Sequence, residues 1–111
     1  MKFLLYSLGS DAPPAPPSPE AMAEIGKLIE DATKAGILVV TGGLAPTAQG
    51  AKLQLSSGKM TVTDGPFAET KEIVGGFAII DVPSMEEALE WAKRFRLIDG
   101  DGESRVRPIY A

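Results

Sequence analysis

The sequence predicts an α+β fold in which a split β-α-β arrangement carries an inserted β-hairpin. Strand-like and helix-like segments follow the order strand, helix, strand, hairpin, strand, helix, strand over 111 residues. Two of the expected strands have apolar side chains at both parities, which is typical of strands covered on both faces. The length allows one core and leaves no room for a second. We therefore expect a single ferredoxin-like domain over residues 1–111.

The first element should be a buried strand over residues 1–8. Phe3 and Leu5 fall on one face of this strand, whereas Leu4 and Tyr6 fall on the other. The proline-rich segment after it cannot donate to a sheet ladder because proline lacks an amide hydrogen. That segment should therefore be a surface loop.

The second element should be a helix that begins after Ser18 and runs to about Ala35. Ser18 suits the N-cap and Pro19 suits the first helical position, while Gly36 is a typical terminator. The sequence GILVVTGG then predicts a strand with a sharp exit at its two glycines.

The middle of the chain predicts a β-hairpin that turns at a serine-glycine pair. Leu53 and Leu55 precede the turn, and Met60 and Val62 follow it, with polar residues between them. This alternation places the four apolar side chains on one face of the hairpin.

The last third predicts a strand, a helix and a short closing strand. Residues 75–82 are apolar on both faces, and Ser84 with Glu87 forms a capping box for the helix. Trp91 flanks the apolar stripe of this helix, which indicates packing rather than a platform for a ligand. Residues 104–109 should form the final strand.

The two-faced strands predict self-association. Two amphipathic helices cover only one face of a sheet, and the inserted hairpin can cover only part of the other. An exposed apolar sheet face is an association site. We therefore expect a homodimer that packs sheet against sheet.

Composition excludes several classes of function. The chain has 11 Lys and Arg against 15 Asp and Glu, a net charge of -4, which argues against binding to nucleic acid or to a membrane surface. It contains no Cys and no His, so disulfides and zinc chemistry are excluded and no cofactor is expected. No apolar run is long enough to span a membrane, which favours a cytoplasmic protein.

The segment VTDGPFAETKEIVGGF resembles the DGPF group of YCII-related proteins, as do GILVVTGGLAP before it and IIDVPSMEEALEWAKR and RVRPI after it. The resemblance spans almost the whole chain and implies a dimeric α/β barrel in a family without a defined activity. Proximity of some DGPF genes to sigma-factor genes implies a regulatory setting. The wider family contains proposed enzymes with a His-Asp pair in a pocket between sheet and helix. Since this chain has no histidine, only the acid carries over, at Asp64.

Asp64 has two interpretations that the sequence leaves open. As a functional residue it would lie at a strand end and transfer a proton, with Lys71 stabilising negative charge and Tyr6 orienting the substrate. As a structural residue it would bond the backbone of an Asp-Gly-Pro turn, in which Gly65 adopts dihedral angles unusual for other residues.

The sequence therefore favours a YCII-related protein that binds a small molecule, with an anion among the expected ligands, in a cleft beside the DGPF loop. An enzyme using Asp64 for acid-base chemistry is one alternative, and a protein-interaction module with a regulatory role is another. Arg105 and Arg107 alternate with Val106 and can share one face near the dimer seam, where they would bind a carboxylate or phosphate. The full set of expected ligand-binding residues is Tyr6, Glu69, Lys71, Arg105 and Arg107.

Overall fold

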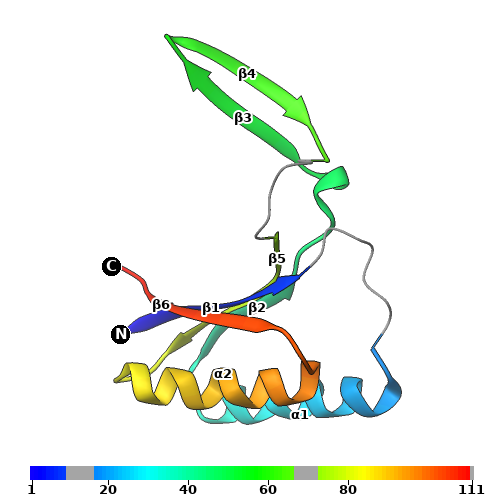
Figure 1. The fold of residues 1–111 in the computed structure, drawn as a ribbon. Coiled ribbons are helices and arrows are strands. Elements are labelled where there is room, and N and C mark those ends of the chain that lie inside the picture. Colours follow the sequence, from blue (N-terminus) through cyan, green and yellow to red (C-terminus); the bar gives the residue numbers. More distant parts are fainter. Residues whose placement is uncertain (10–16, 67–72, 111) are drawn as a thin grey trace.

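The computed structural model describes residues 1–9, 17–66 and 73–110 of the chain. Its main layer is a four-stranded antiparallel sheet with the strand order β2-β5-β1-β6, and the two helices lie together on one face of it (Figure 1). The elements are β1 (Lys2–Gly9), α1 (Pro19–Lys34), β2 (Leu38–Gly43), the 3-10 helix η1 (Thr47–Gln49), β3 (Ala51–Ser56), β4 (Lys59–Asp64), β5 (Ile73–Asp81), α2 (Met85–Asp99) and β6 (Glu103–Pro108). This confirms the expected α+β class and the ferredoxin-like order of elements.

Both helices begin at the serines that the sequence indicated. The Ser18 hydroxyl accepts a hydrogen bond from the Ala21 amide at 3.1 Å, and the Ser84 hydroxyl accepts one from the Glu87 amide at 3.3 Å. Each bond satisfies one of the amides that a helix start leaves without a partner. Gly36 follows α1 with a φ of 73°, a conformation that favours glycine.

The core lies between α2 and one end of the sheet. Phe3 and Ile80 face each other across β1 and β5, and they pack with Val82 and Ala88; all four are at most 2% exposed. Burial of one such large apolar side chain contributes about 1.5–3 kcal/mol. The partly buried residues around them are Leu5, Ile37, Leu38, Trp91 and Val106.

The other face of the sheet is also apolar. Leu4 pairs with Ile79, and Tyr6 pairs with Phe77, at positions whose side chains point away from the helices. We call this side of the sheet the uncovered face, because no helix lies on it in the part of the chain that the structure describes (Figure 1).

The β3–β4 hairpin forms a separate two-stranded sheet. Leu53 pairs with Val62, and Leu55 pairs with Met60, so the four side chains share one face as predicted. They are 56–67% exposed. The hairpin stands away from the four-stranded sheet on the side opposite the helices (Figure 1), instead of lying on the uncovered face.

This projecting hairpin makes the single chain extended. Its Cα radius of gyration is 16.0 Å, whereas about 13 Å is typical of a compact chain of this length. The accessible surface is 7948 Å², which is about 2,000 Å² more than a compact monomer of 11.7 kDa exposes. Across the described residues, neither helix is long and apolar enough to cross a membrane.

Candidate ligand-binding site

Three rows of side chains cross the four strands on the face that looks toward the helices. The strand register defines the first row as Leu38, Ile80, Phe3 and Pro108, the second as Thr41, Ala78, Leu5 and Val106, and the third as Gly43, Gly76, Ser7 and Ser104. Phe3 and Ile80 of the first row lie in the core, with Leu38 packed against them. The third, which we call the Gly-Gly-Ser-Ser row, has no side chain larger than serine, so it leaves space between the sheet and the helices.

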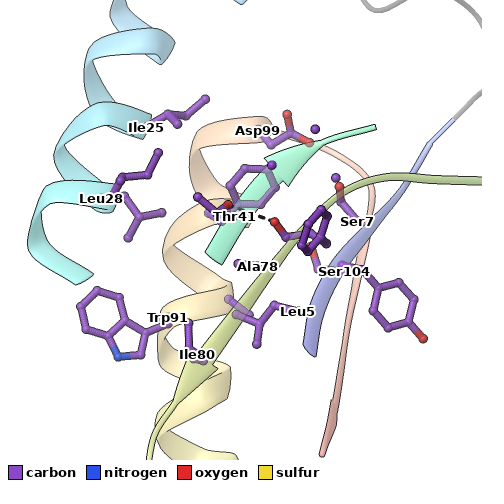
Figure 2. Close-up of a pocket in the computed structure, with 18 of the residues that line it drawn as sticks. Leu5, Ser7, Ile25, Leu28, Thr41, Ala78, Ile80, Trp91, Asp99 and Ser104 are labelled. Atoms are coloured by element: carbon purple, nitrogen blue, oxygen red, sulfur yellow. Dashed lines mark hydrogen bonds between the residues drawn. The ribbon is translucent and has the colours of Figure 1, made fainter. Parts of the chain in front are cut away.

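That space is a cavity of about 720 Å³, and all four members of the Gly-Gly-Ser-Ser row line it. Its volume falls within the range of about 300–1,000 Å³ that is typical of small-molecule sites. Figure 2 shows Ile25 and Leu28 of α1 and Trp91 of α2 around the cavity, with side chains of the sheet on its other side. Its walls are therefore mostly apolar, as expected for a site that holds the body of a small organic molecule.

The two glycines of the row are not required by backbone conformation. Neither Gly43 nor Gly76 has a positive φ. A Cβ atom at Gly76 would lie 3.4 Å from the Gly42 carbonyl oxygen and 3.6 Å from Ser7 Oγ, and one at Gly43 would lie 3.9 Å from the Gly75 carbonyl oxygen. These are ordinary contacts, whereas glycine within a strand weakens it and often marks the close approach of a ligand. The glycines thus provide a bare floor for the cavity.

Ser104 is held in place by a network at the end of α2. Its Oγ atom accepts a hydrogen bond from Arg96 Nη1 at 2.9 Å. The same guanidinium donates to the Gly100 carbonyl oxygen at 3.0 Å and forms an ion pair with the Asp99 carboxylate. Asp99 also lines the cavity, so the charge of Arg96 is balanced at the cavity wall.

Two further hydroxyl groups complete the polar end. Thr41 Oγ1 donates a hydrogen bond to the Phe77 carbonyl oxygen at 2.9 Å, which leaves its lone pairs available (Figure 2). Within the described residues, the Ser7 hydroxyl has no hydrogen-bond partner. Ser7 and Ser104 face each other on neighbouring strands. The cavity thus joins an apolar space to a group of hydroxyls that can hold one polar group by hydrogen bonds.

The site has no set of metal ligands. No group of three or more His, Cys, Asp or Glu residues lies together in the described part of the chain. The carboxylate that lines the cavity, that of Asp99, is engaged by Arg96. Binding is therefore the chemistry that these cavity residues offer most directly.

Asp64, the expected catalytic residue, lies elsewhere. It ends β4 at the base of the hairpin, opposite Ala51, and it is exposed. Next to it, the Gly65 amide donates to the Gly50 carbonyl oxygen at 2.9 Å. A Cβ atom at Gly65 would lie 1.6 Å from the Thr47 carbonyl oxygen, and Gly65 has no positive φ. Glycine is needed there because of a neighbouring backbone, not because of a left-handed conformation.

The other expected ligand-binding residues fall into two groups. Tyr6 pairs with Arg105 across β1 and β6, and Arg107 lies two residues further on, so these three share the uncovered face. Glu69 and Lys71 lie outside the described residues. The structure therefore brings three of the five together on neighbouring strands; Tyr6 is among the residues that line the cavity, whereas Arg105 and Arg107 are not.

Of the residues that line the cavity, the sequence singled out Tyr6 as a ligand-binding residue but not Ser7, Ser104 or the glycines. Ser7 is a polar residue in an otherwise apolar strand, on the face that carries Phe3 and Leu5. In the sequence alone, the pairs Gly42-Gly43 and Gly75-Gly76 indicate ordinary turn or strand-end features. The missing signal was the strand register, which aligns these residues with Ser104.

The whole chain matches one known family. A family model described as the YCII-related domain matches residues 1–111. The chain belongs to the YCII-related domain family. This confirms the resemblance seen in the sequence. An uncharacterized protein of Rhizobium meliloti (strain 1021) is 38% identical to this chain over 89 residues, which cover 79% of this chain and 72% of the relative.

Proposed function

We propose that this YCII-related protein binds a small molecule in the cavity between its sheet and its two helices. The observation that carries the proposal is the 720 Å³ space itself, with apolar walls and hydroxyl groups gathered at one end. Gly75 and Gly76, near the start of β5, line this space. The cleft beside the DGPF loop that the sequence predicts stays a prediction, because residues 67–72 lie outside the described part of the chain.

Trp91 provides a direct test. It is the one tryptophan of the chain, and it lines the cavity. We expect 2-acetylnaphthalene, a small molecule with an apolar body, to shift the Trp91 indole signal and the Gly43 and Gly76 amide signals in ¹H–¹⁵N NMR spectra. Signals of the hairpin from Ala51 to Asp64 should stay in place. Shifts confined to the hairpin, or no shifts up to the solubility limit, would refute the proposal.

Two glycines offer a pair of matched variants. Gly43→Ala places a methyl group on the cavity side of β2, whereas Gly26→Ala places one at an exposed position of α1 that does not line the cavity and has nothing within 4 Å of its Cβ position. We expect Gly43→Ala to weaken binding of the naphthalene probe and Gly26→Ala to leave it unchanged. Equal effects would show that the probe does not occupy the cavity.

The proposal includes a homodimer formed through the uncovered face. A standard interface buries about 800 Å² on each partner, and the chain exposes about 2,000 Å² beyond the surface of a compact monomer. The hairpin, which carries an exposed apolar face, stands on the same side of the sheet as the uncovered face (Figure 1). A second copy seated there would meet both surfaces, with Arg105 and Arg107 near the seam.

The remaining expectations from the sequence stay predictions. If Asp64 transfers a proton to a bound ligand, that ligand should shift the melting temperature of the native protein and of Asp64→Asn by different amounts. If both respond alike, Asp64 has no part in binding. A cytoplasmic location and a regulatory partner are likewise predictions.

A further inference from the structure

We propose that the cavity selects an uncharged ligand with an apolar body and a carbonyl-type oxygen, and that Ser7 and Ser104 donate hydrogen bonds to this oxygen. The inference rests on the proposed function of the cavity and assigns the chemistry of its ligand. Three features of the polar end carry it: the direction in which each hydroxyl donates, the balance of charge at the wall, and the bare floor beside the serines.

Ser104 is set up as a donor. A serine hydroxyl has one proton to donate and two lone pairs to accept with. Arg96 Nη1 donates to Ser104 Oγ at 2.9 Å, so the guanidinium occupies an acceptor position of that oxygen. Its own proton must then point to another acceptor, and Ser104 lines the cavity. Hydrogen bonds from charged groups are stronger than neutral ones and polarise their neighbours. Arg96 is thus a positioning residue that turns Ser104 into a donor toward the cavity.

Ser7 adds a second donor at the same place. It lies directly across from Ser104 in the strand register, and its hydroxyl has no partner within the described residues. Two donors on adjacent strands converge well on one oxygen with two lone pairs. Thr41 can only accept a hydrogen bond from a ligand, since its own proton is already donated to the Phe77 carbonyl oxygen at 2.9 Å.

The charge at the cavity wall disfavours an anion. No lysine or arginine lines the cavity among the described residues. Arg96 lies behind Ser104, and its charge is matched by the carboxylate of Asp99, which does line the cavity. A carboxylate ligand would lose its hydration and meet a like charge, without gaining a free cation. The anion site expected from the sequence would therefore be sought at Arg105 and Arg107, on the other face of the sheet.

The floor of the cavity suits a flat group next to the serines. Gly76 lies between Ser7 and Gly43 in the row, and even a Cβ atom there would lie 3.6 Å from Ser7 Oγ. Without side chains, the ligand can lie against the backbone and bring its oxygen to the serine hydroxyls. Phe95 also lines the cavity, and Trp91 lines it at the end where Ile80 lies (Figure 2).

Three probes with one body and different heads test the assignment. They are 2-acetylnaphthalene, which carries a neutral carbonyl oxygen, 2-ethylnaphthalene, which has no acceptor, and naphthalene-2-carboxylate, which is an anion. Dissociation constants are measured on the full chain from the Trp91 indole signal. We expect the carboxylate to bind at least about 10-fold more weakly than the ketone, since it lacks a free cation at the wall.

Serine variants separate the contribution of the polar group from that of the naphthalene ring. Ser104→Ala and Ser7→Ala should each weaken binding of the ketone by roughly 3- to 10-fold, which is the usual value of one hydrogen bond. Neither variant should weaken 2-ethylnaphthalene. The matched control is Ser56→Ala on the hairpin, which should affect no probe. Thermal melting of each variant checks that the fold is intact.

A double-mutant cycle tests the positioning role of Arg96. In an Arg96→Met background, Ser104→Ala should raise the dissociation constant of the ketone by a smaller factor than it does in the native chain, because Ser104 is no longer held as a donor. A purely structural role for Arg96 would leave that cost unchanged and would affect the hydrocarbon equally.

Each outcome decides one point. Equal responses of the ketone and the hydrocarbon to the serine variants would overturn the assignment of the head group while leaving the binding function in place. Tightest binding by the carboxylate would overturn it as well. Failure of all three probes to reach Trp91 would refute the proposed function of the cavity and, with it, the ligand chemistry.

Discussion

Gly65 is required for a steric reason that the composition of the chain does not reveal. A Cβ atom there would lie 1.6 Å from the Thr47 carbonyl oxygen. We expect Gly65→Ala to lower the free energy of unfolding by about 1–3 kcal/mol, the usual cost of overpacking. Urea denaturation measures it. Gly9→Ala is the control, since nothing lies within 4 Å of its Cβ position. Equal stability of the two variants would contradict the close approach of residues 47 and 65.

An ion pair between the helices gives a dependence on pH. Asp31 of α1 accepts a hydrogen bond from Arg94 of α2 at 2.7 Å. This bond, helped by the charge of Lys27 and opposed by partial desolvation, lowers the pKa of Asp31 below its ordinary value of 3.8. A carboxylate whose pKa is lower in the folded state stabilises the fold above its unfolded pKa, and this stabilisation is lost as the pH falls through the folded pKa.

We therefore expect Asp31→Asn to melt at a slightly lower temperature than the native chain at pH 7, because exposed ion pairs contribute little. The difference should shrink as the pH falls below 3.8. Thermal melts across this range measure it. Glu30→Gln is the control, because Glu30 pairs with Lys34 of its own helix. A difference between Asp31→Asn and the native chain that persists in acid would show that the pair is not the cause.

At the scale of elements, the hairpin stands out because a two-stranded sheet is only marginally stable alone. Leu53 and Leu55 are 63% and 66% exposed on it. If the hairpin packs on a second copy, replacing both by serine should raise the dimer dissociation constant at least about 10-fold, since each loses most of its transfer free energy. Sedimentation velocity measures the change. Gln54→Ser, on the polar face of the same strand, should have no effect; a dimer unaffected by the double variant would leave the hairpin outside the interface.

Elements were predictable wherever a local rule set them. Ser18 and Ser84 indicated both helix starts, and the alternation around the serine-glycine turn indicated the hairpin with its register. The cavity was not predictable, because it depends on where the helices lie over the sheet and on which residues align across four strands. Ser7 and Gly76 are 69 positions apart in the chain, yet they pair directly. No local pattern contains that pairing, whereas the family resemblance pointed to Asp64, which ends the hairpin instead.

For the whole molecule, the apolar character of both sheet faces has a measurable consequence. If two copies pack through the uncovered face, melting temperature should rise with protein concentration, because association stabilises the folded state by mass action. Ile79→Glu, in the centre of that face, should abolish this dependence and give a monomer in light scattering. Gln54→Glu, which adds the same single negative charge on the polar side of the hairpin, should leave it intact. A native chain that is monomeric at micromolar concentration would rule out the dimer.

The three rows beneath the helices have different roles along the sheet: the first contributes to stability, and the third lines the cavity. Phe3 and Ile80 belong to the core that stabilises the fold at one end of the sheet. Two rows away, the residues at 7, 43, 76 and 104 are outside this core and contribute little to stability. Exchanges at those four positions can therefore reshape the chamber at little thermodynamic cost. The same backbone can therefore accommodate ligands of different shape through substitutions in this single row of residues.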